Sequence, residues 1–181
     1  MKALLISIFL FFNINFFQKD HIYLGKGSVD FLSEAPLETI RARSEELKGL
    51  LDLEKRTFAF SIRIKSFDGF NSALQKEHFN EHYLESDLYP KATFSGNLMG
   101  DFDATSDFTE SLVAKGKMNI HNETQMVVIP IELSKEGDDI TASARFDVAL
   151  ADYNISIPKI LEAKISPIIK VDVALKFKPN E

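Results

Sequence analysis

Hydrophobic and polar residues alternate along most of the chain after residue 20, and a period of two is typical of β-strands. In RTFAFSIRIKSF, for example, Phe58, Phe60 and Ile62 alternate with Ala59 and Ser61, so one face is apolar and the other faces water. Seven runs of this kind and two weaker ones predict strands over residues 27–33, 37–43, 47–53, 58–64, 92–98, 112–120, 127–133, 140–150 and 169–177.

Polar segments with turn-forming residues separate these runs. Residues 52–56, 122–125 and 135–139 have the length of hairpin loops, and residues 101–107 form a longer acidic connection. Strands that follow one another through hairpins form antiparallel sheets. The sequence therefore predicts an all-β domain, built either as a barrel or as a sandwich.

One segment departs from this alternation. In SALQKEHFNEHYLE, residues 72–85, apolar and aromatic side chains recur at helical spacing. Ser72 is a suitable N-cap with Gln75 as the second half of a capping box, and Pro90 ends any helix before the next strand. The sequence therefore predicts one helix near residues 72–85, inserted between two strands.

The same segment contains His78, Glu81 and His82 in the order H-x-x-E-H, a motif of one class of zinc peptidases. Residues four positions apart lie on one face of a helix, so His78 and His82 could both ligate one ion, with Glu81 as general base. Those peptidases have a large, mostly helical framework, whereas this chain is rich in strands. A zinc site is therefore the less favoured interpretation of this segment.

The alternative reading is an amphipathic lid. Leu74, Phe79 and Tyr83 would then pack against the strands, and the two histidines would lie at the rim. The chain has no cysteine, which excludes disulfides and Cys-ligated zinc, and it has neither a G-x-S-x-G elbow nor a glycine-rich phosphate loop. No cofactor is predicted.

The first residues, MKALLISIFLFFNINFFQKD, have the features of a signal peptide: Lys2 precedes an apolar run from Ala3 to Phe12, interrupted by Ser7. This run is too short to span a bilayer. We predict a signal peptide at residues 1–18 and a single domain at residues 19–181, periplasmic or secreted and without stable membrane insertion after signal removal. An uncleaved anchoring segment is the alternative.

The net charge of −6 argues against nucleic-acid binding, which needs a basic face.

Several residues at the middle of the predicted strands are small on the inner face. These are Gly96, Ala114, Gly116, Ala142 and Ala144. An eight-stranded barrel is filled by its side chains, or holds one ligand if those side chains are small. The pattern is equally consistent with an elongated apolar space and with glycines and alanines that only let two sheets approach.

Five segments, taken in order, resemble the YceI-like family of lipid- and polyisoprenoid-binding β-barrels. They are GKGSVDFLSEA, FSIRIKSFDG, HFNEHYLESDLYPKATFSG, AKGKMNIHNETQMVVIPIEL and FDVALADYNISIP. The chain departs from the family pattern in its second strand, LETIRARSEELKGLLD, and at Asn122, where the family has glycine. The resemblance implies an eight-stranded, antiparallel, lipocalin-like barrel with a helix near its mouth, an apolar tunnel for an isoprenoid chain, and no catalysis.

The leading hypothesis is a non-catalytic protein that holds a long apolar ligand, such as an isoprenoid, a quinone or another lipid. A zinc-dependent hydrolase using residues 78–82 and a filled structural or stress-related barrel are the alternatives. Whether the protein forms a homodimer is left open by the sequence. Phe79 and Tyr83 are expected at the entrance. The residues predicted to line the interior are Phe58, Phe60, Ile62, Phe94, Met118, Ile131, Ala144, Phe146 and Val173.

Overall fold

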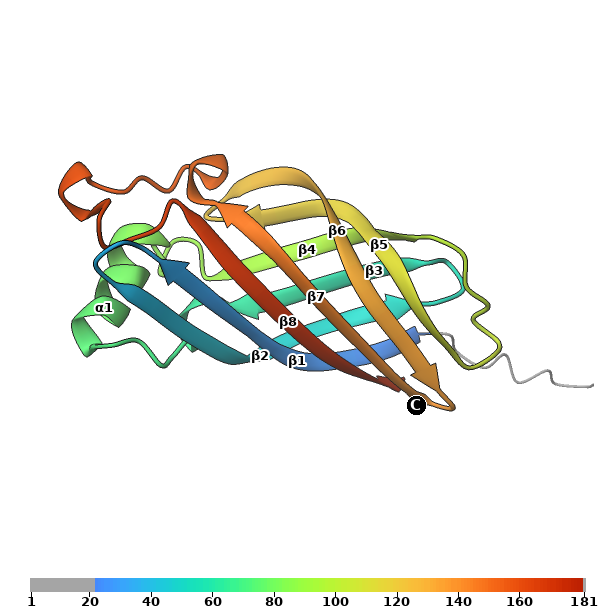
Figure 1. Ribbon diagram of the computed structural model, residues 1–181. Helices are drawn as coiled ribbons and strands as arrows, with labels where there is room; N and C mark the ends of the chain where they lie inside the picture. The colour runs from blue at the N-terminus through green and yellow to red at the C-terminus, as the bar shows by residue number, and fades with distance from the viewer. Residues whose placement is uncertain (1–21, 181) are drawn as a thin grey trace, which may run out of the picture.

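Eight strands follow one another around a closed antiparallel barrel in the computed structural model, which describes residues 22–180 (Figure 1). Each strand pairs with the next, and the last pairs with the first. This confirms the predicted barrel and excludes the sandwich. The strands are β1 Ile22–Glu34, β2 Thr39–Asp52, β3 Thr57–Arg63, β4 Lys91–Met99, β5 Phe108–Ile120, β6 Glu123–Glu136, β7 Asp139–Ala149 and β8 Ile168–Pro179. The predicted signal peptide lies outside the described residues.

The strands predicted over residues 37–43 and 47–53 are one strand, β2, so their separation was wrong. The cause is a β-bulge: Gly27 of β1 pairs with Leu47, but Val29 pairs with Ser44, so β2 has one extra residue there. An extra residue shifts the inward-facing positions by one. The inward set is Ile40, Ala42 and Ser44 before the bulge and Leu47, Gly49 and Leu51 after it.

The predicted helix over residues 72–85 forms as two successive pieces. An α-helix, α1 (Ala73–His78), continues into a turn of π-helix, η2 (Phe79–Tyr83). The Ser72 hydroxyl accepts the Gln75 N–H at 3.2 Å, as predicted, whereas the Gln75 side chain accepts the N–H of Asn71. Three short 3₁₀ helices complete the helical elements of the described residues: η1 Ile64–Ser66, η3 Leu150–Tyr153 and η4 Lys159–Leu161. Among residues 22–180, no helix is long and apolar enough to span a membrane.

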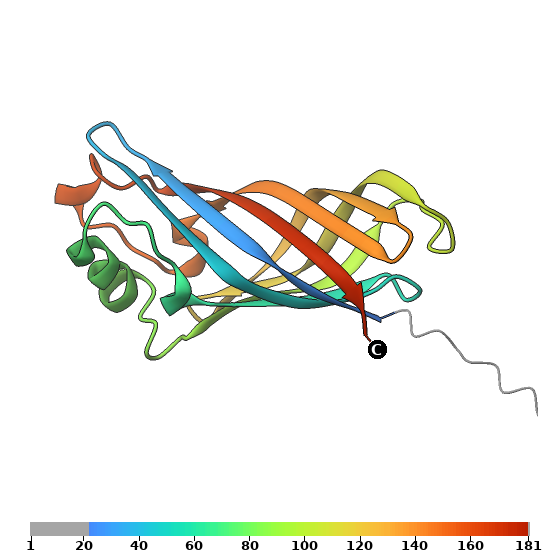
Figure 2. The ribbon, with the colours of Figure 1, turned by 90° about the horizontal axis from the view of Figure 1, so that it is seen from below.

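The antiparallel order sorts the connections between strands to two ends of the barrel. At one end, here called the mouth, lie the β1–β2 turn, the long β3–β4 segment with α1, the β5–β6 turn and the β7–β8 segment with η3 and η4. Figures 1 and 2 agree that α1, the β1–β2 turn and the segment before β8 lie together at this end. The other three connections lie at the opposite end.

The opposite end is closed by buried side chains. Tyr23, Leu53, Leu112 and Ile140 are all at most 5% exposed and form a plug between the strands. Arg56 donates hydrogen bonds to the carbonyl oxygens of residues 100 and 102, at 2.6 and 3.2 Å, and holds the β4–β5 loop against this end. Buried side chains therefore close the barrel at the end opposite the mouth.

The wall of the barrel is not continuous near the mouth. The β2–β3 ladder covers only residues 48–52 and 57–61, and the β6–β7 ladder covers only residues 131–136 and 139–144. Pro130, which has no N–H to donate, lies where the β6–β7 ladder ends. Beyond this point η3 covers the space beside β6, and the Gln125 side chain donates to the Asp152 carbonyl at 2.6 Å.

Gly96 of β4 and Gly116 of β5 form a cross-strand pair. A Cβ atom on Gly96 would lie 2.1 Å from the backbone oxygen of Lys115, and one on Gly116 would lie 2.1 Å from that of Ser95. These two glycines therefore let the adjacent strands β4 and β5 approach closely within one barrel.

We expect Gly96→Ala to lower the free energy of unfolding by roughly 1–3 kcal/mol, because the new methyl group meets backbone that cannot move aside. Urea unfolding followed by circular dichroism measures the effect. The control is Ser95→Ala, an exposed outward-facing neighbour on the same strand, for which we expect a change within about 0.5 kcal/mol. Equal unfolding midpoints for the two variants would contradict this role of Gly96.

Candidate ligand-binding cavity

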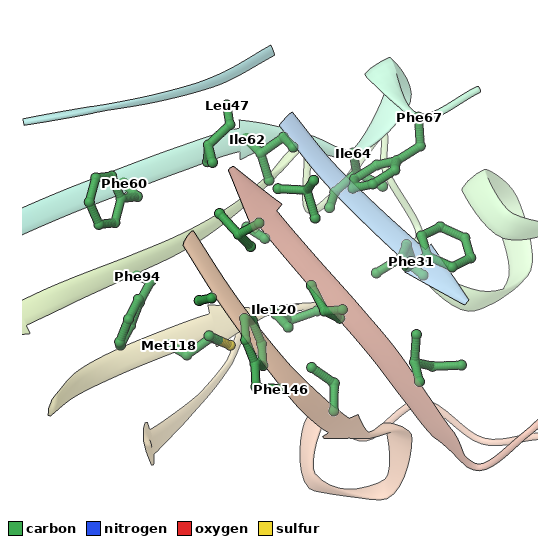
Figure 3. A pocket seen from close by; sticks show the side chains of 18 of the residues that line it. Phe31, Leu47, Phe60, Ile62, Ile64, Phe67, Phe94, Met118, Ile120 and Phe146 are labelled. Carbon is green, nitrogen blue, oxygen red and sulfur yellow. The ribbon is translucent and has the colours of Figure 1, made fainter. Parts of the chain in front are cut away.

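The barrel encloses a cavity of about 490 Å³ that reaches from the mouth toward the plug. Side chains from all eight strands and from α1, η2 and the β7–β8 segment contribute to its wall. Figure 3 shows side chains of facing strands pointing into this common space, with Phe60 and Phe94 toward one end and Phe31 and Phe67 toward the other. Its volume is within the usual range for small-molecule sites, roughly 300–1,000 Å³. The filled-barrel alternative does not describe this interior.

Every residue that the sequence analysis predicted to line the ligand space lies on the cavity wall, and so do the two predicted entrance residues. That these residues contact a ligand stays a prediction. They are Phe58, Phe60, Ile62, Phe94, Met118, Ile131, Ala144, Phe146 and Val173, with Phe79 and Tyr83.

The open space depends on alanines and not on glycines. Ala144 lies between Ile131 of β6 and Val173 of β8 in one cross-strand row, and all three side chains line the cavity. Ala114 and Ala142 line it as well, whereas Gly96 and Gly116 do not. Short side chains in this row leave a volume that larger ones would fill.

Phenylalanines line the part of the cavity nearer to the plug. The rings of Phe58 and Phe94 lie 4.7 Å apart, and those of Phe58 and Phe60 lie 5.3 Å apart and nearly parallel. Phe60 pairs across strands with Gly49, and its ring lies where a side chain at Gly49 would be. Glycine on β2 thus provides the room for an aromatic ring on β3, and these rings form a rigid apolar wall.

A second group of phenylalanines surrounds the mouth, and the sequence analysis assigned only Phe79 of this group to the site. Phe31 of β1 lies 5.4 Å from both Phe67 and Phe79, and Phe70 lies 5.1 Å from Phe79, measured between ring centroids. Phe67 and Phe70 follow η1 in a connection with no periodic pattern. Their aromatic character was the only sign available in the sequence.

Polar groups on the cavity wall gather mainly near the mouth. Glu38, Gln75, His78 and Lys164 line it there, and Gln75 Nε2 donates to Glu38 Oε1 at 2.5 Å. Burial raises the pKa of the Tyr83 hydroxyl above its ordinary value, so this group stays protonated and able to donate a hydrogen bond at neutral pH. The cavity therefore has an apolar interior and hydrogen-bonding groups at its opening.

The H-x-x-E-H residues do not form a metal site. The rings of His78 and His82 lie 5.2 Å apart, but His78 lines the cavity while His82 and Glu81 are exposed. Among residues 22–180, no group of three or more potential ligands is placed to hold an ion. The lid interpretation also needs a correction, because Leu74 is 58% exposed and only Phe79 and Tyr83 face the strands. The α-helix ends at His78, so Leu74 and Phe79 belong to different helical pieces.

His121 joins three segments of the mouth and was missed as a structural element. Its Nε2 lies 2.7 Å from Glu85 Oε2, its Nδ1 lies 3.2 Å from the carbonyl oxygen of Tyr153, and its ring packs edge-on against Tyr89. Both oxygens are acceptors, so the two hydrogen bonds form together when both ring nitrogens carry a proton. This clamp fixes the β3–β4 segment, the β5–β6 turn and η3 relative to one another.

A closed eight-stranded barrel with an apolar cavity that opens at one end is the architecture of lipocalin-like binding proteins. The model of the YceI-like domain matches residues 25–177, and the chain belongs to this family. The resemblance seen in the sequence is thereby confirmed. Comparison with curated protein sequences gives no match.

Three solved structures illustrate the similarity in fold. A polyisoprenoid-binding domain from Saccharophagus degradans, implicated in plant cell wall breakdown, has a TM-score of 0.71 at 15% identity and covers 90% of this chain and 100% of its own. BcnA of Burkholderia cenocepacia has a TM-score of 0.69 at 15% identity, covering 84% of this chain and 95% of its own. The YceI protein of Campylobacter jejuni has a TM-score of 0.60 at 16% identity, and the match covers 76% of this chain and 84% of the Campylobacter chain.

We expect the purified protein to bind less than one zinc ion per chain, because His78 and His82 have no third ligand among residues 22–180 and a closed coordination sphere needs more. Elemental analysis after dialysis against zinc at micromolar concentration measures this. The double variant His78→Ala/His82→Ala should have the same zinc content as the unaltered protein. One zinc per chain that is lost in His78→Ala would instead support the hydrolase.

Proposed function

We propose that this protein is a non-catalytic carrier that holds a long apolar molecule, such as an isoprenoid, a quinone or another lipid, inside its barrel. The observation that carries this proposal is the distribution of polarity along the cavity, which is hydrocarbon in its interior and polar near its mouth. An amphiphile fits this distribution with its chain inside and its head at the opening.

Burial of the chain supplies the affinity. Removing apolar surface from water stabilises a complex by roughly 25 cal/mol per Å², less the cost of immobilising the ligand. The head would lie near Glu38, Gln75 and His78, and hydrogen bonds between the head and these groups would fix its orientation while contributing less to affinity.

The relatives support the same class of ligand. The domain from Saccharophagus degradans binds polyisoprenoids, and its fold is similar to that of this chain over nearly the whole length. At 15% identity the similarity is one of fold. The proposal for this chain therefore rests on its own cavity, and the relative indicates which ligands to test first.

We propose no catalytic role, because the wall of the cavity is almost entirely hydrocarbon and a reaction needs polar groups in contact with the reacting atoms. We further propose that the protein acts in the periplasm or outside the cell. The apolar run from Ala3 to Phe12 after Lys2 supports this location, since it has the length of a signal peptide core.

Ala144→Trp tests the proposal directly. The indole would project into the open space beside Ile131 and Val173, so we expect the amount of bound lipid to fall about tenfold or more, which corresponds to 1.4 kcal/mol or more of binding free energy. Native mass spectrometry of protein purified from its own host measures the retained lipid.

The matched control is Asp147→Trp, an exposed position on the outer face of the same strand. It should retain lipid as the unaltered protein does, and both variants should unfold cooperatively. Equal lipid content in Ala144→Trp and Asp147→Trp would show that the ligand does not occupy this cavity.

A further inference from the structure

Several large apolar side chains project into solvent at the mouth, including Leu88 (67% exposed) and Ile168 (43% exposed), and three more come from the β1–β2 turn, α1 and η4. Leu37 in the β1–β2 turn is 74% exposed, Leu74 in α1 is 58% exposed, and Ile160 in η4 is 87% exposed. Single exposed apolar residues are common on protein surfaces. These three differ because they lie around the opening of one cavity.

Each of them is the immediate sequence neighbour of a residue on the cavity wall. Leu37 precedes Glu38, Leu74 precedes Gln75, and Ile160 precedes Leu161, and the second residue of each pair lines the cavity. The chain at each point thus turns one side chain inward and the next one outward. We call Leu37, Leu74 and Ile160 the apolar rim.

Hydrogen bonds hold the three segments of the rim together. Gln75 Nε2 donates to Glu38 Oε1 at 2.5 Å, which joins α1 to the β1–β2 turn. The Leu37 N–H donates to the Ala163 carbonyl at 2.8 Å, which joins the same turn to the segment after η4. The exposed side chains are therefore presented by one connected surface and not by three independent loop tips.

Charged groups border this rim. Lys159 and Lys164 lie on either side of Ile160, with Glu162 between them, so residues 158–166 carry a net charge of +1 although the whole chain carries −6. Glu77 is exposed beside Lys76 on α1, and Lys76 lies 3.3 Å from Asp68. Residues 68–87, which include α1, carry a net charge of −4, so the η4 part of the rim is basic and the α1 part is acidic.

We propose that the apolar rim docks onto a lipid bilayer and places the mouth of the cavity against the membrane. Leucine and isoleucine side chains enter the boundary between headgroups and acyl chains, and lysines beside them reach the headgroup phosphates. A long apolar ligand then moves between bilayer and cavity without crossing water, which would cost it the full hydrophobic free energy. This inference rests on the proposed function, since it gives the route by which that ligand enters.

The first test is co-sedimentation with vesicles of phosphatidylcholine, alone and mixed with phosphatidylglycerol. We expect the unaltered protein to bind both, because burial of the apolar rim drives the contact. The triple variant Leu37→Ser/Leu74→Ser/Ile160→Ser should bind about tenfold more weakly or worse, because it has lost its apolar contacts with the bilayer. The matched control is Leu24→Ser/Leu50→Ser, a pair that is 47% and 48% exposed on the outer wall and away from the mouth.

A second measurement does not depend on removing side chains. The chain contains no tryptophan, so Ile160→Trp and Leu24→Trp each carry a single indole. On addition of vesicles, the emission of Ile160→Trp should shift to shorter wavelength and be quenched by brominated lipid. The emission of Leu24→Trp should not change.

Binding of a fluorescent fatty acid added from water, without any membrane, separates this inference from the proposed function. If the triple variant binds the fatty acid normally but has lost vesicle binding, the rim docks as proposed. If the unaltered protein binds neither kind of vesicle, or if the triple variant binds them equally well, the docking surface is overturned while the carrier function stands. If vesicles bind but neither the fatty acid nor a fluorescent isoprenoid does, the carrier function fails and the docking surface stands.

Discussion

The hydrogen-bonded ladder between β1 and β8 is the constraint on which the rest of the structure depends. It pairs ten residues of β1, from Tyr23 to Leu32, with ten of β8 and turns a meander of hairpins into a closed barrel. Closure leaves no free sheet edge along these strands and encloses an interior lined mainly by apolar side chains. Without it, the phenylalanines of β3 and β4 would lie on one open face of a sheet.

The interior is then divided by the sizes of its side chains. Tyr23, Leu53 and Leu112 fill one end completely, and phenylalanine rings occupy the region next to them. Ala142 and Ala144 leave the space farther along. The unequal filling gives the cavity a closed end and an open end. The hydrogen-bonding groups and the apolar rim both lie at the open end.

Much of this could be predicted from the sequence, because alternation reports directly which side chains share a face. All predicted lining residues therefore lie on the cavity wall. The bulge in β2 was not predicted, since an extra residue looks like the end of one strand and the start of another. Gly96 and Gly116 were ambiguous because their role depends on the neighbouring strand. Phe67 and Phe70 lie in an irregular connection, where position along the chain says nothing about spatial neighbours.

The short β6–β7 ladder leaves part of the barrel wall near the mouth without backbone hydrogen bonds between these two strands. Residues 123–130 of β6 and 145–149 of β7 belong to different neighbours, so widening the tube between them breaks no bonds of that ladder. Near the mouth, the separation of β6 and β7 is set by side-chain packing and by the hydrogen bond from Gln125 to Asp152. These contacts are easier to deform than a ladder of backbone hydrogen bonds. Nearer the plug, the β6–β7 ladder of residues 131–136 and 139–144 holds the two strands at a fixed separation. For the carrier proposed above, this part of the wall is where a ligand with a bulky head would be accommodated with the least disruption of backbone hydrogen bonds.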